Sequence, residues 1–337
     1  MNIALTPLTS WQDELKNAIT CPEMLLKELQ LPSNLLTGAK LGDALFSLRV
    51  PRPYLNRIEK GNPNDPLLKQ ILPIKEEAST VPGYVSDPLA ETSANHQSGL
   101  IHKYKNRVLL ILSGACAINC RYCFRRHFAY DDNQIGRQQW ASVLEYLKKN
   151  PQVNEVILSG GDPLATSDQR LLNFLADLNK LPQLIRLRIH TRLPVVIPQR
   201  MTSRLLTGLQ ASRLKVVIVL HINHPNEIDE DVIQTCQRIK SHDITLLNQA
   251  VLLKDVNDDV SVQKTLSERL FAAGILPYYL FLFDKVAGAA HFDLEESVAK
   301  ELVGQLQAEL PGYLVPRLAR EIPGKPAKTL LAPLLNT

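Results

Sequence analysis

From residue 107 onward, short apolar segments alternate with longer amphipathic ones, and this alternation restricts the fold more than any other feature. The apolar segments have the length of strands covered on both faces, and they lie at 107–114, 155–161, 184–191, 215–221, 245–252, 276–283 and 314–321. Helix-like segments separate them, at 138–149, 168–179, 201–210, 228–240, 259–272 and 294–310. A repeat of about 30 residues predicts an α/β fold with a parallel sheet, which we interpret as a full or partial β/α barrel.

The residues before this repeat follow no such pattern. Segments 11–19 and 21–31 look helical, whereas the stretch from Pro51 to Pro88 is rich in prolines and loops. We therefore divide the chain into an N-terminal extension (1–95), a barrel (96–310) and a C-terminal segment (311–337). No chemistry suggests itself in the extension.

Charge and hydropathy exclude some classes of protein. The net charge is +4, and no run of five Lys or Arg residues suggests a nucleic-acid surface. No apolar run is long enough to cross a bilayer, and the first residues do not resemble a signal peptide. The five cysteines are an odd number, and three of them fall within eight residues, which argues against a disulfide framework. We therefore expect a reducing, cytoplasmic location without membrane contact.

Polar and glycine-rich sequences follow five of the predicted strands. They read SGACAINCRYC, SGGDPL, HTRLP, HINHP and FDKVAGAAHF, after the first, second, third, fourth and sixth strands. In a barrel the loops at the carboxyl ends of the strands meet at one face, where active sites lie. The sequence therefore predicts one active site built from these loops.

Three cysteines in the first loop, Cys116, Cys120 and Cys123, have the spacing C-x3-C-x2-C. Three thiolates in one loop can bind three irons of a [4Fe–4S] cubane and leave the fourth iron open. The alternative is a zinc site completed by His127, in a protein that is not an enzyme. We favour the cluster, because structural zinc sites usually bring together two separated pairs of ligands.

With Tyr122 inside the spacing, this motif resembles the radical S-adenosylmethionine superfamily. The resemblance implies that S-adenosylmethionine binds the open iron and is cleaved to start radical chemistry. Gly160, Gly161 and Asp162 match the superfamily's glycine-rich segment, which implies contacts with this cofactor. Glycine lets the backbone approach a ligand closely, and an aspartate can accept hydrogen bonds from a cationic amine.

Further motifs resemble the lysine 2,3-aminomutase family. They are RVLLILSGACAINCRYCFRRHF, SGGDPL, TRLPVVIPQRMT, LLNQAVLLKDVNDD and HF at 291–292, and the match runs from about Tyr104 to Lys328. The resemblance implies a six-fold partial β/α barrel of the radical S-adenosylmethionine type. It also implies a second cofactor, pyridoxal 5′-phosphate, bonded to a lysine near the C-terminus. We place that lysine at Lys328, with Lys325 as the rival, because the family's glycine run has become Gly324-Lys325-Pro326-Ala327.

The same resemblance implies roles for other side chains. Arg107 matches a position at the phosphate of pyridoxal phosphate, while Asn248 and Gln249 match a segment near S-adenosylmethionine. Arg125 matches the position that binds the substrate carboxylate. Asp284 and Glu321 fall where the lysine enzymes have acids for the distant ammonium group.

The expected reaction converts L-lysine to (R)-β-lysine. The catabolic enzymes of the family carry a longer C-terminal segment with more cysteines, whereas this chain ends nine residues after Lys328. It therefore resembles the compact branch whose product a ligase attaches to elongation factor P, and an electron donor such as flavodoxin is implied. A catabolic lysine 2,3-aminomutase, or a related amino-acid aminomutase, is the alternative.

Overall fold

The parallel strands form one continuous sheet. The structure is a computed structural model, and it describes residues 10–91, 95–130, 133 and 135–335. Ten strands lie in the sheet in chain order. They are β1 (Asn95–Gln97), β2 (Leu100–Tyr104), β3 (Arg107–Ser113), β4 (Glu155–Gly160), β5 (Arg186–Thr191), β6 (Lys215–His221), β7 (Thr245–Val251), β8 (Leu276–Phe281), β9 (Arg317–Arg320) and β10 (Thr329–Leu330).

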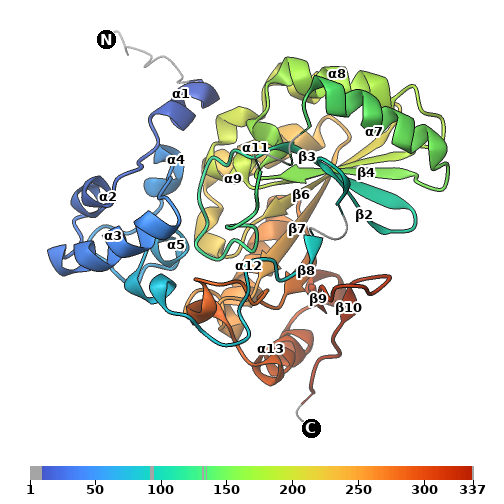
Figure 1. The fold of residues 1–337 in the computed structure, drawn as a ribbon. Helices are drawn as coiled ribbons and strands as arrows, with labels where there is room; N and C mark the ends of the chain where they lie inside the picture. The colour runs from blue at the N-terminus through green and yellow to red at the C-terminus, as the bar shows by residue number, and fades with distance from the viewer. Residues whose placement is uncertain (1–9, 92–94, 131–132, 134, 336–337) are drawn as a thin grey trace, which may run out of the picture.

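Strands β3 to β9 pair in parallel, and the antiparallel strands β1, β2 and β10 extend the two edges. One long helix follows each of the strands β3 to β8 (Figure 1). These helices are α7 (Arg137–Lys149), α8 (Asp168–Leu178), α10 (Ser203–Gln210), α11 (Glu230–Lys240), α12 (Val260–Ala272) and α13 (Glu296–Glu309). Six β/α units followed by β9 confirm the predicted partial barrel, and the sheet is not closed.

The burial of side chains along the strands and helices explains why the alternation of apolar and amphipathic segments predicted these elements. In β4 every residue after Glu155 is buried, as expected for a parallel strand covered on both faces. Helix α8 buries Leu171, Phe174, Leu175 and Leu178, which recur at the spacing of one helical face. The side chain of Ser167 caps the first turn of this helix by accepting a hydrogen bond from the backbone N–H of Arg170.

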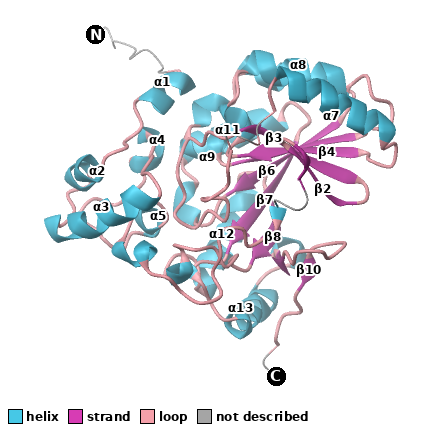
Figure 2. Cartoon of the chain, viewed as in Figure 1, coloured by secondary structure: helices cyan, strands magenta, loops and turns pink. Residues whose placement is uncertain are grey.

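The N-terminal residues form short helices on one side of the sheet (Figure 1, blue). These are α1 (Trp11–Lys16), α2 (Pro22–Glu28), α3 (Leu36–Leu45), α4 (Arg52–Leu55) and α5 (Pro66–Lys69). Two of them, α4 and α5, lie in the stretch expected to be loops (Figure 2). Both have a proline in the first turn, where its missing N–H costs no hydrogen bond. Side chains such as Trp11 and Tyr54 belong to the same hydrophobic core as the barrel.

The C-terminal residues return to the sheet. Strand β10 pairs antiparallel with β9, with Thr329 opposite Arg320, and the intervening residues form the loop that carries Lys328. The backbone of Leu334 then donates to the carbonyl of Lys300 on α13, at 3.0 Å. In the described part of the chain, none of the helices combines the length and the apolar character needed to span a membrane.

Candidate active site

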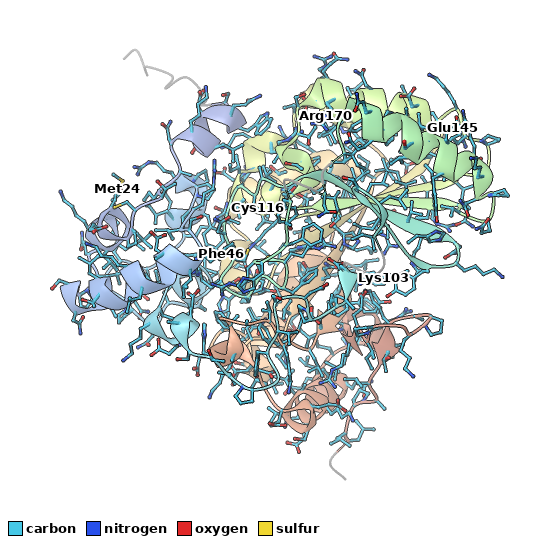
Figure 3. The ribbon with its side chains drawn as sticks, in the orientation of Figure 1. Met24, Phe46, Lys103, Cys116, Glu145 and Arg170 are labelled. Carbon is cyan, nitrogen blue, oxygen red and sulfur yellow. The ribbon has the colours of Figure 1, made fainter. Side chains whose placement is uncertain are left out.

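A cavity of about 700 Å³ opens at the carboxyl ends of the parallel strands and continues into the barrel. Its wall includes most of the side chains singled out from the sequence: Arg107, Cys116, Cys120, Cys123, Arg125, Gly160, Gly161, Asp162, Gln249, Asp284, Glu321 and Lys328. The cysteine loop lies between the N-terminal helices and the sheet, as the label on Cys116 shows (Figure 3). Asn248 and Lys325 are not part of the wall.

The glycine pair at the end of β4 fixes the cysteine loop. The backbone N–H of Gly161 donates to the carbonyl of Ser113 at 2.8 Å, and that of Asp162 donates to Ala115 at 2.9 Å. A Cβ atom on Gly161 would lie 2.6 Å from the carbonyl oxygen of Gly114. Gly160 has φ +126°, a conformation that other residues rarely adopt. The pair therefore lets β4 and the cysteine loop touch backbone to backbone.

Asp162, next to the glycine pair, is buried and holds the ends of two strands together through hydrogen bonds. Its carboxylate accepts hydrogen bonds from the hydroxyl of Thr191 and from the backbone N–H groups of Leu164, Arg192 and Leu193, at 2.7–3.0 Å. Burial raises the pKa of Asp162, and these hydrogen bonds oppose that rise. The observed partners of Asp162 are therefore groups of the protein, which tie the end of β4 to the end of β5.

The donor set of the cysteine loop suits an iron–sulfur cluster. Burial raises the pKa of Cys116, and the neighbouring Cys123 raises it further, so binding to a cation would stabilise the thiolates. Among the residues that the structure describes, no three His, Cys, Asp or Glu side chains are placed to hold one metal ion. A cubane makes a different demand, because each cysteine binds a different iron.

The histidine considered for the zinc alternative contacts a different loop. His127 is exposed, and its Nε2 atom lies 3.0 Å from the carbonyl oxygen of Ala287. It is not part of the cavity wall. The structure therefore gives the three thiols no histidine partner from this position.

Arg192 is a site residue that sequence reasoning missed. It is 5% exposed, and its Nη1 atom lies 2.7 Å from Cys120 Sγ and 2.6 Å from the hydroxyl of Tyr122. Its Nη2 atom donates to Gln70, Glu227 and Tyr54, at 2.8, 2.8 and 3.1 Å. The sequence signals were its places in the strand-end segment HTRLP and in the family motif TRLPVVIPQRMT, neither of which indicated a contact with a cysteine.

A second missed residue, Glu91, holds the guanidinium of Arg125. Two parallel hydrogen bonds of 2.6 and 2.8 Å join Nε and Nη2 of Arg125 to the Glu91 carboxylate. The remaining nitrogen, Nη1, donates to Ser159 Oγ and to the carbonyl of Gly160. Both side chains are buried, so the paired carboxylate fixes the arginine in the cavity wall.

Ion pairs continue from Glu91 to the far end of the cavity. Lys103 Nζ lies 3.6 Å from Glu91 Oε1 and 3.3 Å from Glu321 Oε1. Glu321 Oε2 in turn accepts a hydrogen bond of 2.5 Å from Lys328 Nζ. Positive and negative groups thus alternate from Arg125 to Lys328, and Lys103 is a third site residue that the sequence did not reveal.

The pKa values of the two predicted acids shift in opposite directions. Lys328 and Lys103 lower the pKa of Glu321 more than burial raises it, so this side chain is ionised. Burial, followed by the charge of Glu321, raises the pKa of Asp284 to about 7. Near neutral pH one carboxylate is therefore fixed in its charged form, whereas the other readily gains or loses a proton.

The two candidate lysines occupy different environments. Lys328 lies in the cavity wall, and its ammonium group stands 4.9 Å from the centre of the Phe281 ring. Lys325 is exposed, in the loop before Lys328. Only Lys328 is therefore placed to contact a molecule inside the cavity.

The neighbouring residues Asn248 and Gln249 on β7 differ in position: one supports the fold and the other lines the cavity. Gln249 lines the cavity, and its amide lies 2.8 Å from Nε2 of His221. Asn248 is 2% exposed and exchanges two hydrogen bonds with the backbone of Ile222. Arg107 lines the cavity near the start of β3, where its guanidinium stacks 4.1 Å from the ring centre of Tyr104.

Comparisons with known proteins agree with this geometry. The sequence model described as "Radical SAM superfamily" matches residues 110–262. A protein named L-lysine 2,3-aminomutase from Haemophilus influenzae is 50% identical over 96% of this chain and 96% of its own length. A protein of the same name from Escherichia coli is 47% identical, over 95% of this chain and 94% of its own length. Another, from Clostridium subterminale, is 35% identical over 96% of this chain and 78% of its own length.

Proposed function

The chain belongs to the lysine 2,3-aminomutase family of radical S-adenosylmethionine enzymes, and from this premise we propose that it isomerises L-lysine to (R)-β-lysine with the help of pyridoxal phosphate. One observation carries the proposal: a single cavity has the cysteine loop on one wall and Lys328 on another. The charged groups between them suit an amino acid that carries one carboxylate and two ammonium groups.

In this proposal a positive side chain binds the substrate carboxylate, and negative side chains bind its distant ammonium group. Arg125, fixed by Glu91, is the cation for the substrate carboxylate. Asp284 and Glu321 are the acids for the distant ammonium group, and both lie on the cavity wall. In the structure Glu321 accepts a hydrogen bond from the ammonium group of Lys328, which supports a role for this carboxylate in binding a primary ammonium group. A substrate without a side-chain amine would bring no cation to these two acids.

The cavity also suits pyridoxal phosphate. Lys328 would hold the cofactor, and Arg107, whose guanidinium lies on the same cavity wall, would bind its phosphate. When bound, pyridoxal phosphate supplies an electron-delocalising ring attached to the substrate nitrogen. Tyr278 and Phe281 contribute aromatic surface to the cavity wall, and the Phe281 ring lies next to the ammonium group of Lys328.

The radical S-adenosylmethionine domain implies a [4Fe–4S] cluster and S-adenosylmethionine, for which we propose the three cysteines and the nearby loops. Cys116, Cys120 and Cys123 would hold the cluster. Gly160 and Gly161 line the cavity beside the cysteine loop, and Gln249 offers an amide on the cavity wall. In this proposal Asp162 and Asn248 act as supports of the wall, since the structure gives both of them protein partners.

The test is formation of β-lysine by the purified protein. The protein would be reconstituted without oxygen with iron, sulfide and pyridoxal phosphate, and then incubated with S-adenosylmethionine, dithionite and L-lysine. We expect (R)-β-lysine on a chiral column, and no product when pyridoxal phosphate is omitted. Cleavage of S-adenosylmethionine without β-lysine would retain the radical enzyme and refute lysine as substrate. A protein that retains zinc and no iron would refute the cluster.

We further propose that the β-lysine is used to modify elongation factor P in the cytoplasm. This role rests on the resemblance to the compact branch, and it requires a lysyl ligase as partner and an electron donor such as flavodoxin. Elongation factor P would be incubated with the ligase, ATP and the product of the reaction above, and its intact mass measured. An increase by one β-lysyl group is expected; an unchanged mass would favour the catabolic alternative.

A further inference from the structure

The guanidinium of Arg192 connects the cysteine loop to the N-terminal residues. On one side its Nη1 atom contacts Cys120 Sγ and the hydroxyl of Tyr122, at 2.7 and 2.6 Å. On the other side its Nη2 atom is held by Tyr54 on α4 and by Gln70, which follows α5. The side chain is 5% exposed, so its charge acts at short range in a medium that screens it little.

A buried carboxylate completes this arrangement. Glu227 is fully buried and accepts from Arg192 Nη2 at 2.8 Å. It is itself held by the backbone N–H groups of Asn223 and His224, at 2.9 and 3.1 Å, and by the amide of Gln70. The arginine therefore cannot turn away from Cys120 without losing several hydrogen bonds.

We propose that Arg192 is a positioning residue that sets the reduction potential of the cluster by donating to the sulfur of Cys120, and that the N-terminal residues hold it there. The inference rests on the proposed binding of the cluster by Cys116, Cys120 and Cys123. Hydrogen bonds to the cysteine sulfurs and nearby charge are two of the means by which proteins tune such potentials.

The sign of the effect follows from charge. A one-electron reductant converts a [4Fe–4S]²⁺ cluster to the [4Fe–4S]⁺ state, and with three thiolates the net charge changes from −1 to −2. A cation beside Cys120 stabilises the more negative state and raises the potential. Glu227, which partly neutralises this cation, lowers it.

The experiment is a redox titration of the reconstituted protein, without S-adenosylmethionine, lysine or pyridoxal phosphate. The reduced cluster is followed by electron paramagnetic resonance in the presence of dithionite and mediators. In Arg192→Met we expect the ratio of reduced to oxidised cluster at a fixed potential to fall at least about threefold. In Glu227→Gln, which retains hydrogen-bonding capacity and removes the charge, the ratio should rise.

Arg200→Gln is the matched control. Arg200 is also fully buried, is hydrogen-bonded to Leu164, Thr166 and Asp168, and stacks on Trp11 of α1, but it does not contact a cysteine. Its substitution should leave the potential unchanged. Equal potentials in the wild type and in Arg192→Met would overturn the proposal, and so would shifts in the same direction for Arg192→Met and Glu227→Gln.

Two further variants separate the possible failures. If Arg192→Met does not assemble a cluster, Arg192→Lys and Glu227→Gln together decide the sign of the shift in reduction potential. Arg192→Lys retains the positive charge but loses the forked guanidinium group. A cluster that survives in Cys120→Ala would refute the assignment of the cluster to these cysteines. Neither outcome depends on formation of β-lysine, so the proposed activity is tested separately.

Discussion

The two ends of the cavity are built differently. At the cysteine end, Asp162 and Arg192 are buried and make several hydrogen bonds each to groups whose positions are fixed by strands and short helices. At the lysine end, Lys103, Glu321 and Lys328 are half-buried, and they are joined by ion pairs between flexible side chains. The first arrangement holds one geometry, whereas the second can exchange partners.

This difference fits the tasks proposed for each end. A cluster must stay in place through many reactions, so the groups around it are satisfied by the protein itself. A substrate must enter and leave, and under the proposed function its ammonium group would take the place at Glu321 that Lys328 gives up when it bonds pyridoxal phosphate. We therefore expect substitutions at the cysteine end to change stability or cluster content. Substitutions at the lysine end should change the affinity for substrate and the pH dependence of that affinity.

The largest effect is expected from Lys328→Ala. Lys328 is the only one of the two candidate lysines in the cavity wall, so its loss should reduce β-lysine formation below detection and abolish the visible absorption of bound pyridoxal phosphate. Lys325→Ala is the matched control and should retain both. The reverse result would move the cofactor to Lys325.

Gly161→Ala should damage the cysteine end. A Cβ atom would lie 2.6 and 2.7 Å from the carbonyl oxygens of Gly114 and Ala115, so the backbone of the cysteine loop must shift. We expect a loss of about 1–3 kcal/mol in the free energy of unfolding, together with incomplete cluster assembly. Gly312→Ala, where an added Cβ atom would meet no other atom within 4 Å, should leave both unchanged. Denaturant titration and iron analysis would check this.

Asp284→Asn should weaken substrate binding at the lysine end. Loss of a charged hydrogen bond to the substrate ammonium is expected to raise the KM for lysine about 10- to 100-fold, with cluster content unchanged. A KM equal to that of the wild type would exclude Asp284 from the substrate site.

The same residue gives a prediction for pH. Because the pKa of Asp284 is raised to about 7, its ionised fraction increases as the pH rises from 6 to 8, and the KM for lysine should fall over that range. The stability of the protein without substrate has the opposite pH dependence. The native state retains a proton that the unfolded state has lost, so stability decreases as pH rises from about 4 to 7. Asp284→Asn should flatten both profiles, which steady-state kinetics and thermal unfolding would measure.

The smallest effect is expected from Glu91→Gln. The amide can accept only one of the two parallel hydrogen bonds that fix the Arg125 guanidinium, so the arginine is held less firmly and the KM for lysine should rise about threefold to tenfold, the size of one hydrogen bond. Asp168→Asn alters a similar pair with Arg200 outside the cavity and should leave the KM unchanged. Equal effects of the two substitutions would show that Glu91 acts only through stability.

The fold was predictable because its signals are local. Each strand and helix of the barrel carries its own apolar pattern, and the six β/α units follow from chain order. The three cysteines were recognisable for the same reason. Asn248 and Gln249 show the limit of a motif: neighbours in a strand point to opposite faces, so only Gln249 lines the cavity.

The residues that were missed act over long distances in sequence. Arg192 meets Cys120 across 72 positions and Tyr54 across 138. Lys103 lies on β2 and Glu91 precedes β1, in a part of the chain where the sequence shows no chemical motif. Such contacts depend on packing between distant segments, and no local spacing encodes them.

The central claim is that both ends of the cavity act on the same lysine molecule, and isotope transfer tests it most directly. L-lysine deuterated at carbon 3 would be incubated with the reconstituted protein, S-adenosylmethionine and dithionite, and the S-adenosylmethionine would then be recovered for mass spectrometry. We expect deuterium to appear in the adenosyl part of the cofactor as β-lysine forms. Cleavage of S-adenosylmethionine with no deuterium in either S-adenosylmethionine or 5′-deoxyadenosine would contradict the claim.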